Sequence, residues 1–225
     1  MLRRAIQFRF LVLFMGSILV CTVLLFPLIN AQTKYNRTIS ILEAAYRGEI
    51  QAVHTYMAYA KRADSENYKN IAYLFVALAT SESIHARNFE TLLSELGVEV
   101  KKKPNQQIEV SNTKKNLKKA TEFELKEIDT QYPQFIVKIE PEKCEEAIHN
   151  ITYAWKSEKQ HRDIIRKIQS GTGMFFGLLA KRIEGTPVQY FVCQKCGSTL
   201  TEFPKDNCPI CKGPVSNYKR IRKIY

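Results

Sequence analysis

Hydrophobic residues recur at intervals of three and four through the middle of the chain, which is the period of an amphipathic helix. Residues 38–96 contain no proline and a single glycine, and the polar stretch 64–67 divides them. The pattern predicts four helices, over residues 39–64, 67–96, 113–131 (with a kinked continuation past Tyr132-Pro133) and 142–169. Short or moderate links between them predict a mainly α protein built on an antiparallel four-helix bundle.

The first 31 residues follow a different pattern. Residues 10–29 are twenty positions without a charge, preceded by three arginines and no acid. A helix of that length spans about 30 Å, the thickness of the hydrocarbon core of a bilayer. We therefore expect residues 10–29 to enter a membrane, with the arginines on its cytoplasmic side. Residues 1–31 would be an uncleaved signal anchor, with the soluble part extracytoplasmic, or a signal peptide cleaved near Ala31.

Composition narrows the class of protein only slightly. The 225 residues are 45% hydrophobic and 25% charged, which excludes wholesale disorder. The net charge of +12 comes partly from lysines clustered at 101–103 and 114–119. No nucleic-acid-binding motif accompanies these lysines, so we expect a solvated surface and no nucleic-acid partner.

Two of the predicted helices carry the same polar motif. The motifs are Glu82-x-x-His85 and Glu158-x-x-His161. Each places an acid and an imidazole one turn apart on one helix face. A lone glutamate precedes each motif by one helix: Glu49 lies 33 residues before the first acid, and Glu124 lies 34 residues before the second. The second helical pair therefore repeats the polar layout of the first, as a degenerate internal duplication would.

Such a set of acids needs compensating charge if it lies inside a bundle. One Glu-x-x-His is usually solvated surface, but two with matched glutamates and apolar neighbours indicate a common site. An unpaired buried carboxylate costs several kcal/mol, whereas two divalent cations would balance four of them. Oxygen and imidazole ligands suit iron or manganese better than zinc, which prefers fewer, tetrahedral ligands. The set resembles that of ferritin-like di-iron and di-manganese proteins, so we expect a dinuclear site.

One further acid and two tyrosines fall near this set. Glu127 lies one turn after Glu124, where the first half has Ala52. It is either a seventh ligand or a surface acid. Tyr56 and Tyr132 are expected to hydrogen-bond metal ligands. We assign no role to three remaining residues, His54, His149 and Cys144.

Four cysteines near the C-terminus form two Cys-x-x-Cys turns. They are Cys193, Cys196, Cys208 and Cys211. This spacing predicts a tetrahedral metal site in a small domain over 189–225, joined to the bundle by a linker over 171–188. Disulfides are the less favoured alternative, because pairs two residues apart are strained and so small a module needs its metal to fold. The spacing leaves a zinc ribbon and a one-iron rubredoxin-type centre open.

In this order, the two parts resemble a rubrerythrin, a ferritin-like di-iron bundle (here residues 38–170) followed by a rubredoxin-like domain. The resemblance implies iron in both sites and an exchange of Glu127 and His85 on one iron as the redox state changes. It implies that hydrogen peroxide is reduced to water with electrons relayed through the cysteine-bound iron, while Tyr56 and Tyr132 orient ligands or supply protons. It also implies an electron donor (a reductase or a rubredoxin-like protein) and a homodimer.

The sequence departs from the resemblance in three ways. Phe123 stands where the family usually has glycine, and the connection over 97–112 is unusually basic; both bear on packing and partner choice more than on the metals. The N-terminal segment is atypical of a mostly cytoplasmic family and bears on the identity of the electron donor. The alternatives are a ferroxidase or other O₂-reducing di-iron protein, and a non-enzymatic, membrane-tethered electron carrier. Glu127 favours the peroxidase, because a ferroxidase does not need that extra ligand.

Overall fold

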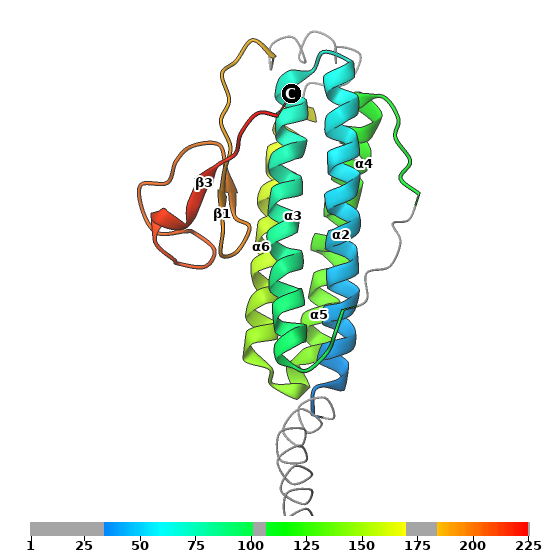
Figure 1. The fold of residues 1–225 in the computed structure, drawn as a ribbon, viewed down its shortest axis with the longest axis vertical. Helices are drawn as coiled ribbons and strands as arrows, with labels where there is room; N and C mark the ends of the chain where they lie inside the picture. The colour runs from blue at the N-terminus through cyan, green and yellow to red at the C-terminus, as the bar shows by residue number, and fades with distance from the viewer. Residues whose placement is uncertain (1–33, 101–106, 170–183, 225) are drawn as a thin grey trace, which may run out of the picture.

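A computed structural model describes residues 34–100, 107–169 and 184–224, and its helices run side by side as a bundle (Figure 1). The long members are α2 (Asn36–Ser65), α3 (Lys69–Glu95) and α6 (Glu145–Gln169). The remaining position is filled in succession by α4 (Thr113–Lys126), the π-helical η1 (Glu127–Gln131) and α5 (Tyr132–Ile139). The predicted mainly α bundle is confirmed.

The third position of the bundle is not the plain kinked helix that was predicted. In η1 the backbone N–H of Tyr132 donates to the carbonyl of Glu127, five residues back, which is the π-helical spacing. Pro133 has no N–H to return to the carbonyl of Ile128, and Trp155 Nε1 of α6 donates to that carbonyl at 2.9 Å instead. The chain therefore passes the proline without ending the helix.

The start of α6 also differs from the prediction, by three residues. Residues 140–142 form the 3₁₀ turn η2 (Glu140–Glu142), and Lys143 then adopts the left-handed region at φ 52°. Both features end the preceding helix before α6 begins at Glu145.

Distant acids satisfy the first N–H groups of two helices. Glu142 accepts from the backbone N–H of Thr38 at 2.8 Å, at the start of α2. Glu184 accepts from the backbone N–H of Asn70 at 2.9 Å, at the start of α3. A carboxylate at a helix N-terminus pairs unbonded N–H groups and is favoured by the helix dipole. Glu184 also fixes the chain entering the small domain to the bundle.

Two hydrophobic clusters fill the bundle, one toward each end. One contains Phe75 and Leu78 of α3, and the other contains Phe89 and Leu93 of the same helix. The α3 residues between the two clusters include buried polar side chains, which is where the acids and histidines lie. The bundle is thus held together by apolar packing on both sides of a polar middle.

The C-terminal part forms a small antiparallel sheet with strand order β2-β1-β3. Its strands are β1 (Phe191–Cys193), β2 (Thr199–Leu200) and β3 (Tyr218–Arg220), and the 3₁₀ turn η3 (Val215–Asn217) precedes β3. The sheet lies against α3 and α6 of the same chain (Figure 1). Tyr73 Oη of α3 donates to the carbonyl of Ile221 at 2.6 Å, and its ring meets that of Tyr190 edge-on at 5.0 Å.

Within the described ranges, no helix combines the length and hydrophobicity needed to span a bilayer. The predicted membrane segment, residues 10–29, lies outside those ranges, as does most of the predicted linker at 171–188.

Candidate metal centres

Acids and histidines from every long segment of the bundle meet in its polar middle. The buried members are Glu49 (α2), Glu82 and His85 (α3), Glu124 (α4), Glu127 (η1), and Glu158 and His161 (α6). None is more than 3% exposed. The structure thus brings together the seven residues that the sequence singled out for the dinuclear site.

Six of these side chains form two overlapping groups of four. Within each group the potential ligand atoms lie within 4.8 Å of one another. The groups are Glu49, Glu82, His85 and Glu158, and Glu82, Glu124, Glu158 and His161. Glu82 and Glu158 belong to both groups, so each can bridge two cation positions. Each position is completed by one histidine and one lone glutamate.

The contacts show how the shared carboxylates divide their oxygens. His85 Nδ1 lies 3.0 Å from Glu82 Oε2 and 3.2 Å from Glu158 Oε1. His161 Nδ1 lies 3.2 Å from Glu82 Oε1 and 2.8 Å from Glu158 Oε2. Each bridging carboxylate therefore turns one oxygen toward each histidine, as a pair of bridged metal ions requires.

The electrostatics of this cluster fit a pair of cations. Glu124 Oε2 is buried without a hydrogen-bond partner, and Glu82 Oε2 and Glu158 Oε1 have no hydrogen bond beyond the ionic contacts with His85 Nδ1 given above. Burial raises the pKa of Glu49 to about 7 and, together with the charge of Glu158, raises the pKa of Glu124 well above its usual range. Burial opposes protonation of the two histidines, but the surrounding carboxylates raise their pKa values. A buried set with this excess of acid is stabilised by bound metal.

The small domain covers the far side of both imidazoles. His85 Nε2 lies 3.2 Å from the carbonyl oxygen of Cys196, and His161 Nε2 lies 3.2 Å from Thr199 Oγ1. The Thr199 hydroxyl donates to the carbonyl of Gly197 at 3.0 Å, which leaves its oxygen free to accept from the imidazole. These partners place the ring proton on Nε2 and leave Nδ1 as the metal ligand.

A glycine is required where this loop meets the bundle. Gly197 has φ +78°, and a Cβ there would lie 2.2 Å from His85 Nε2 and 2.8 Å from Ser81 Oγ. Ser81 Oγ donates to the carbonyl of Gly197 at 2.7 Å and lies 3.3 Å from Ser157 Oγ. Sequence reasoning missed both serines, although each directly precedes the glutamate of a Glu-x-x-His motif. No local pattern marked Thr199.

The two tyrosines each serve the opposite half of the bundle. Tyr56 Oη donates to Glu124 Oε1 at 2.5 Å, and Tyr132 Oη donates to Glu49 Oε1. Tyr56 lies seven residues after Glu49, whereas Tyr132 lies eight residues after Glu124. The extra residue falls in the stretch that contains the π-helical η1, which absorbs it and keeps the second tyrosine facing the metal ligands.

Glu127 lies beside the ligand groups and not among them. It belongs to neither group of four, yet only 3% of it is exposed. Burial and the charges of Glu158 and Glu49 raise its pKa well above the usual range. The structure therefore excludes the alternative of a surface acid and shows His85 within the first group while Glu127 stands outside it.

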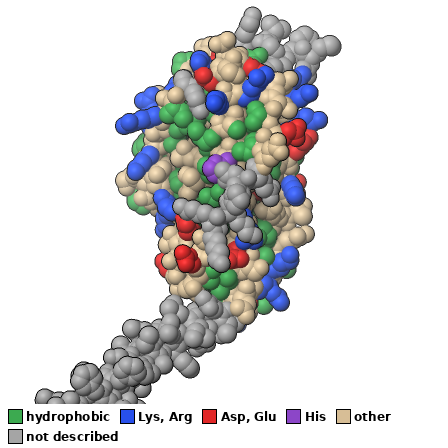
Figure 2. All heavy atoms as spheres, turned by 45° about the vertical axis from the view of Figure 1, so that its right-hand side comes forward, with side chains coloured by type: hydrophobic (Ala, Val, Ile, Leu, Met, Phe, Trp, Pro, Cys, Tyr) green, Lys and Arg blue, Asp and Glu red, His purple; other side chains and the backbone are tan. Residues whose placement is uncertain are grey.

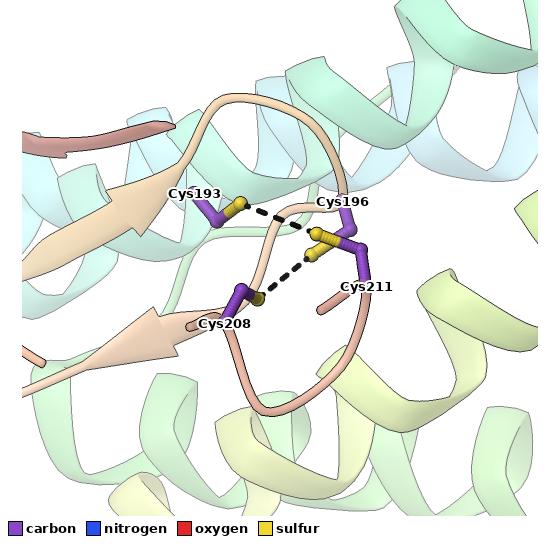
Figure 3. A group of neighbouring side chains, drawn as sticks. All are labelled: Cys193, Cys196, Cys208 and Cys211. Carbon is purple, nitrogen blue, oxygen red and sulfur yellow. Dashed lines mark hydrogen bonds between the residues drawn. The ribbon is translucent and has the colours of Figure 1, made fainter. Parts of the chain in front are cut away.

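The four cysteines gather in the small domain with their sulfurs turned toward one another (Figure 3). Cys193 Sγ lies 3.8 Å from Cys211 Sγ, and Cys196 Sγ lies 3.5 Å from Cys208 Sγ. All four are buried free thiols, so no disulfide forms among them. The cluster fits the predicted four-cysteine metal site, and it is closed, because its most exposed member is Cys211 at 8%.

The residues without an assigned role have ordinary surroundings. Cys144 is buried against a hydrophobic cluster, and the His149 ring stacks on that of Tyr153 at 6.2 Å. His54 is half-buried on α2. None of the three lies in a metal group of the described residues.

Comparison with known proteins gives one consistent result. A family model described as Rubrerythrin matches residues 40–169. Rubrerythrin-2 of Clostridium acetobutylicum is 30% identical over 175 residues, which cover 77% of this chain and 91% of that protein. Nigerythrin of Nitratidesulfovibrio vulgaris is 28% identical over 191 residues, covering 84% of this chain and 89% of that protein.

Solved structures agree with this result. The structure of nigerythrin in a mixed-valence state superposes with a TM-score of 0.70 at 28% identity, covering 82% of this chain and 86% of that one. The bacterioferritin of Desulfovibrio desulfuricans, whose structure describes a diiron site, superposes with a TM-score of 0.65 at 22% identity, covering 70% and 92%. At that identity the second match speaks for the fold, and it confirms the ferritin-like bundle.

Proposed function

The chain belongs to the rubrerythrin family, and we propose that it is a di-iron peroxidase that reduces hydrogen peroxide to water. The observation that carries the proposal is the buried acid Glu127, which stands beside a complete six-residue ligand set. A bundle that only stored or oxidised iron would not need a seventh buried carboxylate at that place. Defence against oxidative stress is the corresponding role.

The chemistry needs two electrons and two protons for each peroxide, and the O–O bond breaks to release two water molecules. Two irons in the bundle would supply the electron pair when bound, and a third in the four-cysteine site would replace these electrons one at a time. Mixed carboxylate and imidazole ligands suit iron in the bundle, and the closed thiolate site suits outer-sphere transfer.

The chain itself offers a short route between the two sites. Cys196 is one of the four thiols, and its own carbonyl oxygen lies 3.2 Å from His85 Nε2. His85 Nδ1 in turn faces the bundle ligands. An electron leaving the thiolate cluster thus meets one residue, one hydrogen bond and one imidazole before it reaches the dinuclear site.

The two tyrosines would orient ligands and hold protons beside the site. Burial raises the pKa of Tyr56 and of Tyr132 well above the usual range, so both hydroxyls stay protonated. Tyr56 donates its hydroxyl proton in a hydrogen bond to Glu124, and Tyr132 donates to Glu49 in the other half of the ligand set. Both tyrosines therefore orient a ligand and hold a proton close to where water forms.

Glu127 would exchange with His85 at the first cation position as the oxidation state changes. His85 belongs to the first group of ligands, and the buried Glu127 lies beside it. An added carboxylate stabilises the more oxidised state, because it brings a negative charge to the higher metal charge.

A stoichiometric titration tests the peroxidase. The purified, iron-loaded protein is reduced without oxygen, and hydrogen peroxide is added while both iron centres are followed. We expect one equivalent of peroxide to remove two electrons from the bundle, faster than air does. Zinc in the four-cysteine site, with no visible absorption, would contradict the electron relay.

We also propose that residues 1–31 place the protein at a membrane, anchored or exported after cleavage near Ala31. The uncharged stretch of twenty residues behind three arginines supports this. Fractionation of cells that express the full chain, followed by alkaline extraction, tests it. Recovery of the full-length protein in the untreated soluble fraction would contradict both forms.

Two partners complete the proposal, an electron donor and a second copy of the chain. The donor would be a reductase or a rubredoxin-like protein that passes single electrons to the four-cysteine site. A homodimer would bring two such chains together, although the small domain already contacts its own bundle in this structure. Sedimentation of the soluble part at several concentrations tests the dimer, and a monomer throughout would contradict it.

A further inference from the structure

A pocket opens on the face of the bundle formed by α2 and α4. Its volume is about 160 Å³. Its lining includes Thr55, Tyr56 and Tyr59 of α2, and Lys119, Ala120 and Phe123 of α4. Aromatic rings and small apolar groups make up most of this wall, and Lys119 Nζ pairs with Glu109 at 2.7 Å. Gln51 and Thr55 also line the pocket, but most of its exposed surface is apolar, so it offers few hydrogen-bond partners to a guest.

The inner end of the pocket lies one side chain from the metal ligands. Tyr56 lines the pocket, and its hydroxyl donates to Glu124 Oε1 at 2.5 Å. Glu124 belongs to the second cation group, and its other oxygen is buried without a hydrogen-bond partner. Tyr56 therefore links the wall of the pocket to a ligand of the second cation group.

The small domain covers one side of the bundle, and the pocket opens on the other side. The small domain covers α3 and α6, where Cys196 and Thr199 contact both imidazoles (Figure 1). The α2 and α4 side lies opposite, and there Figure 2 shows hydrophobic side chains gathered over the upper half with Lys and Arg around them. Electrons would enter on the covered side, and this pocket lies on the other side of the bundle.

We propose that this pocket admits an organic hydroperoxide, with its alkyl group held between α2 and α4. The inference rests on the peroxidase function proposed above. The pocket is several times larger than the share of liquid volume that one water molecule takes, about 30 Å³. An apolar wall of this size offers hydrogen peroxide little recognition, whereas it buries an alkyl group from water.

The reaction balances in the same way as with hydrogen peroxide. The O–O bond of the hydroperoxide breaks with two electrons, which the four-cysteine site replaces, and two protons. One oxygen leaves as water and the other as the alcohol, which departs through the same pocket. Tyr56, between the pocket and Glu124, holds a proton close to that bond.

Substitutions at the mouth and wall of the pocket test the proposal. Thr55→Trp fills the pocket, Phe123→Ala widens it, and Thr91→Trp places the same bulk at an exposed position on α3 as a control. The reduced, iron-loaded proteins are mixed with tert-butyl hydroperoxide and, separately, with hydrogen peroxide. We expect Thr55→Trp to slow the reduction of tert-butyl hydroperoxide about tenfold more than that of hydrogen peroxide. Phe123→Ala should have the reverse effect on the two rates, and the control should match wild type.

Xenon binding gives a readout that does not depend on turnover. Crystals of the iron-loaded protein under xenon pressure should show an atom against Tyr56 and Phe123, because apolar cavities bind xenon. The atom should be absent from Thr55→Trp. No xenon in the wild-type pocket, or equal rates with both oxidants in every variant, would overturn the inference. A wild type that hydrogen peroxide fails to reoxidise would instead overturn the peroxidase function.

Discussion

The two halves of the bundle carry the same ligands but differ in what lies around them. In the first half, α2 and α3 are unbroken and contribute Glu49, Glu82 and His85. In the second half, Glu124 is followed by a π-helical segment, an added buried acid and a shorter helix before α6. The shared part of the pattern therefore builds the cation sites, and the part that breaks the repeat distinguishes one side of the site from the other.

The largest predicted effect is on metal content, which should fall further when a ligand shared by both cation groups is removed than when an unshared one is. Glu82→Ala and Glu158→Ala each remove a carboxylate that belongs to both cation groups, so we expect loss of both metals from the bundle. Glu49→Ala and Glu124→Ala each affect one group, and we expect about one metal to remain. Metal analysis after gel filtration measures this, with the four-cysteine absorption as an internal control. Equal metal loss in all four variants would contradict the bridged arrangement.

The loop over the imidazoles allows each half to be perturbed separately. Gly197→Ala places a Cβ against His85 Nε2, and Thr199→Val removes the hydroxyl beside His161 Nε2. We expect each to weaken metal binding about 10–100-fold, as loss of such a second partner does. Titration of the metal-free proteins with ferrous ion checks this, and Thr201→Val, in the exposed loop that follows, is the matched control. Unchanged affinity in both variants would show that the loop does not position the imidazoles.

The crossed tyrosines give a smaller and symmetric prediction. Tyr56→Phe and Tyr132→Phe each remove one hydrogen bond to a lone glutamate, so we expect each to slow peroxide reduction by about tenfold with full metal content. Stopped-flow mixing of the reduced proteins with peroxide measures it. Tyr46→Phe, at another buried ring of α2, serves as the control. A large effect in only one of the pair would mean that the halves do not share proton delivery.

The smallest predicted effect concerns the π-helical segment. Trp155→Phe leaves the carbonyl of Ile128 without its donor, which should lower the free energy of unfolding by about 1–3 kcal/mol. Pro133→Ala returns a backbone N–H to that stretch. In a protein that carries Pro133→Ala, Trp155→Phe should therefore lower the free energy of unfolding by less. Chemical denaturation of the four proteins completes the double-mutant cycle. Strictly additive changes would show that the indole does not replace the missing N–H.

Much of the site could be predicted because its ligands repeat at fixed offsets. Glu82 and His85 share a helix face, and Glu158 and His161 repeat that spacing, so periodicity predicted each pair. The resemblance to ferritin-like dinuclear sites then predicted that the pairs meet. The four cysteines were equally clear, since 19 residues hold the whole cluster. In both cases the ligands lie a few residues apart in the sequence, in a spacing that occurs twice.

The remainder could not be predicted, because it depends on contacts between distant segments. The donor from Trp155 to Ile128 joins two helices, and no spacing rule marks it. Thr199 and Gly197 meet the imidazoles only because the small domain docks on α3 and α6. Helical periodicity also gave no sign of the π-helical residue, whose effect is visible only in the eight-residue offset of Tyr132.

A single ratio of rates decides whether Glu127, the acid that breaks the repeat, makes the site a peroxidase. The reduced, iron-loaded protein is mixed with hydrogen peroxide or with oxygen, and the ratio of the two reoxidation rates is compared between wild type and Glu127→Ala. Glu122→Ala, an exposed acid on α4, is the control. We expect the rate with peroxide divided by the rate with oxygen to be well above one in wild type and in the control, and to fall about 10²-fold in Glu127→Ala with the four-cysteine spectrum unchanged. A Glu127→Ala protein with the ratio of wild type would contradict it.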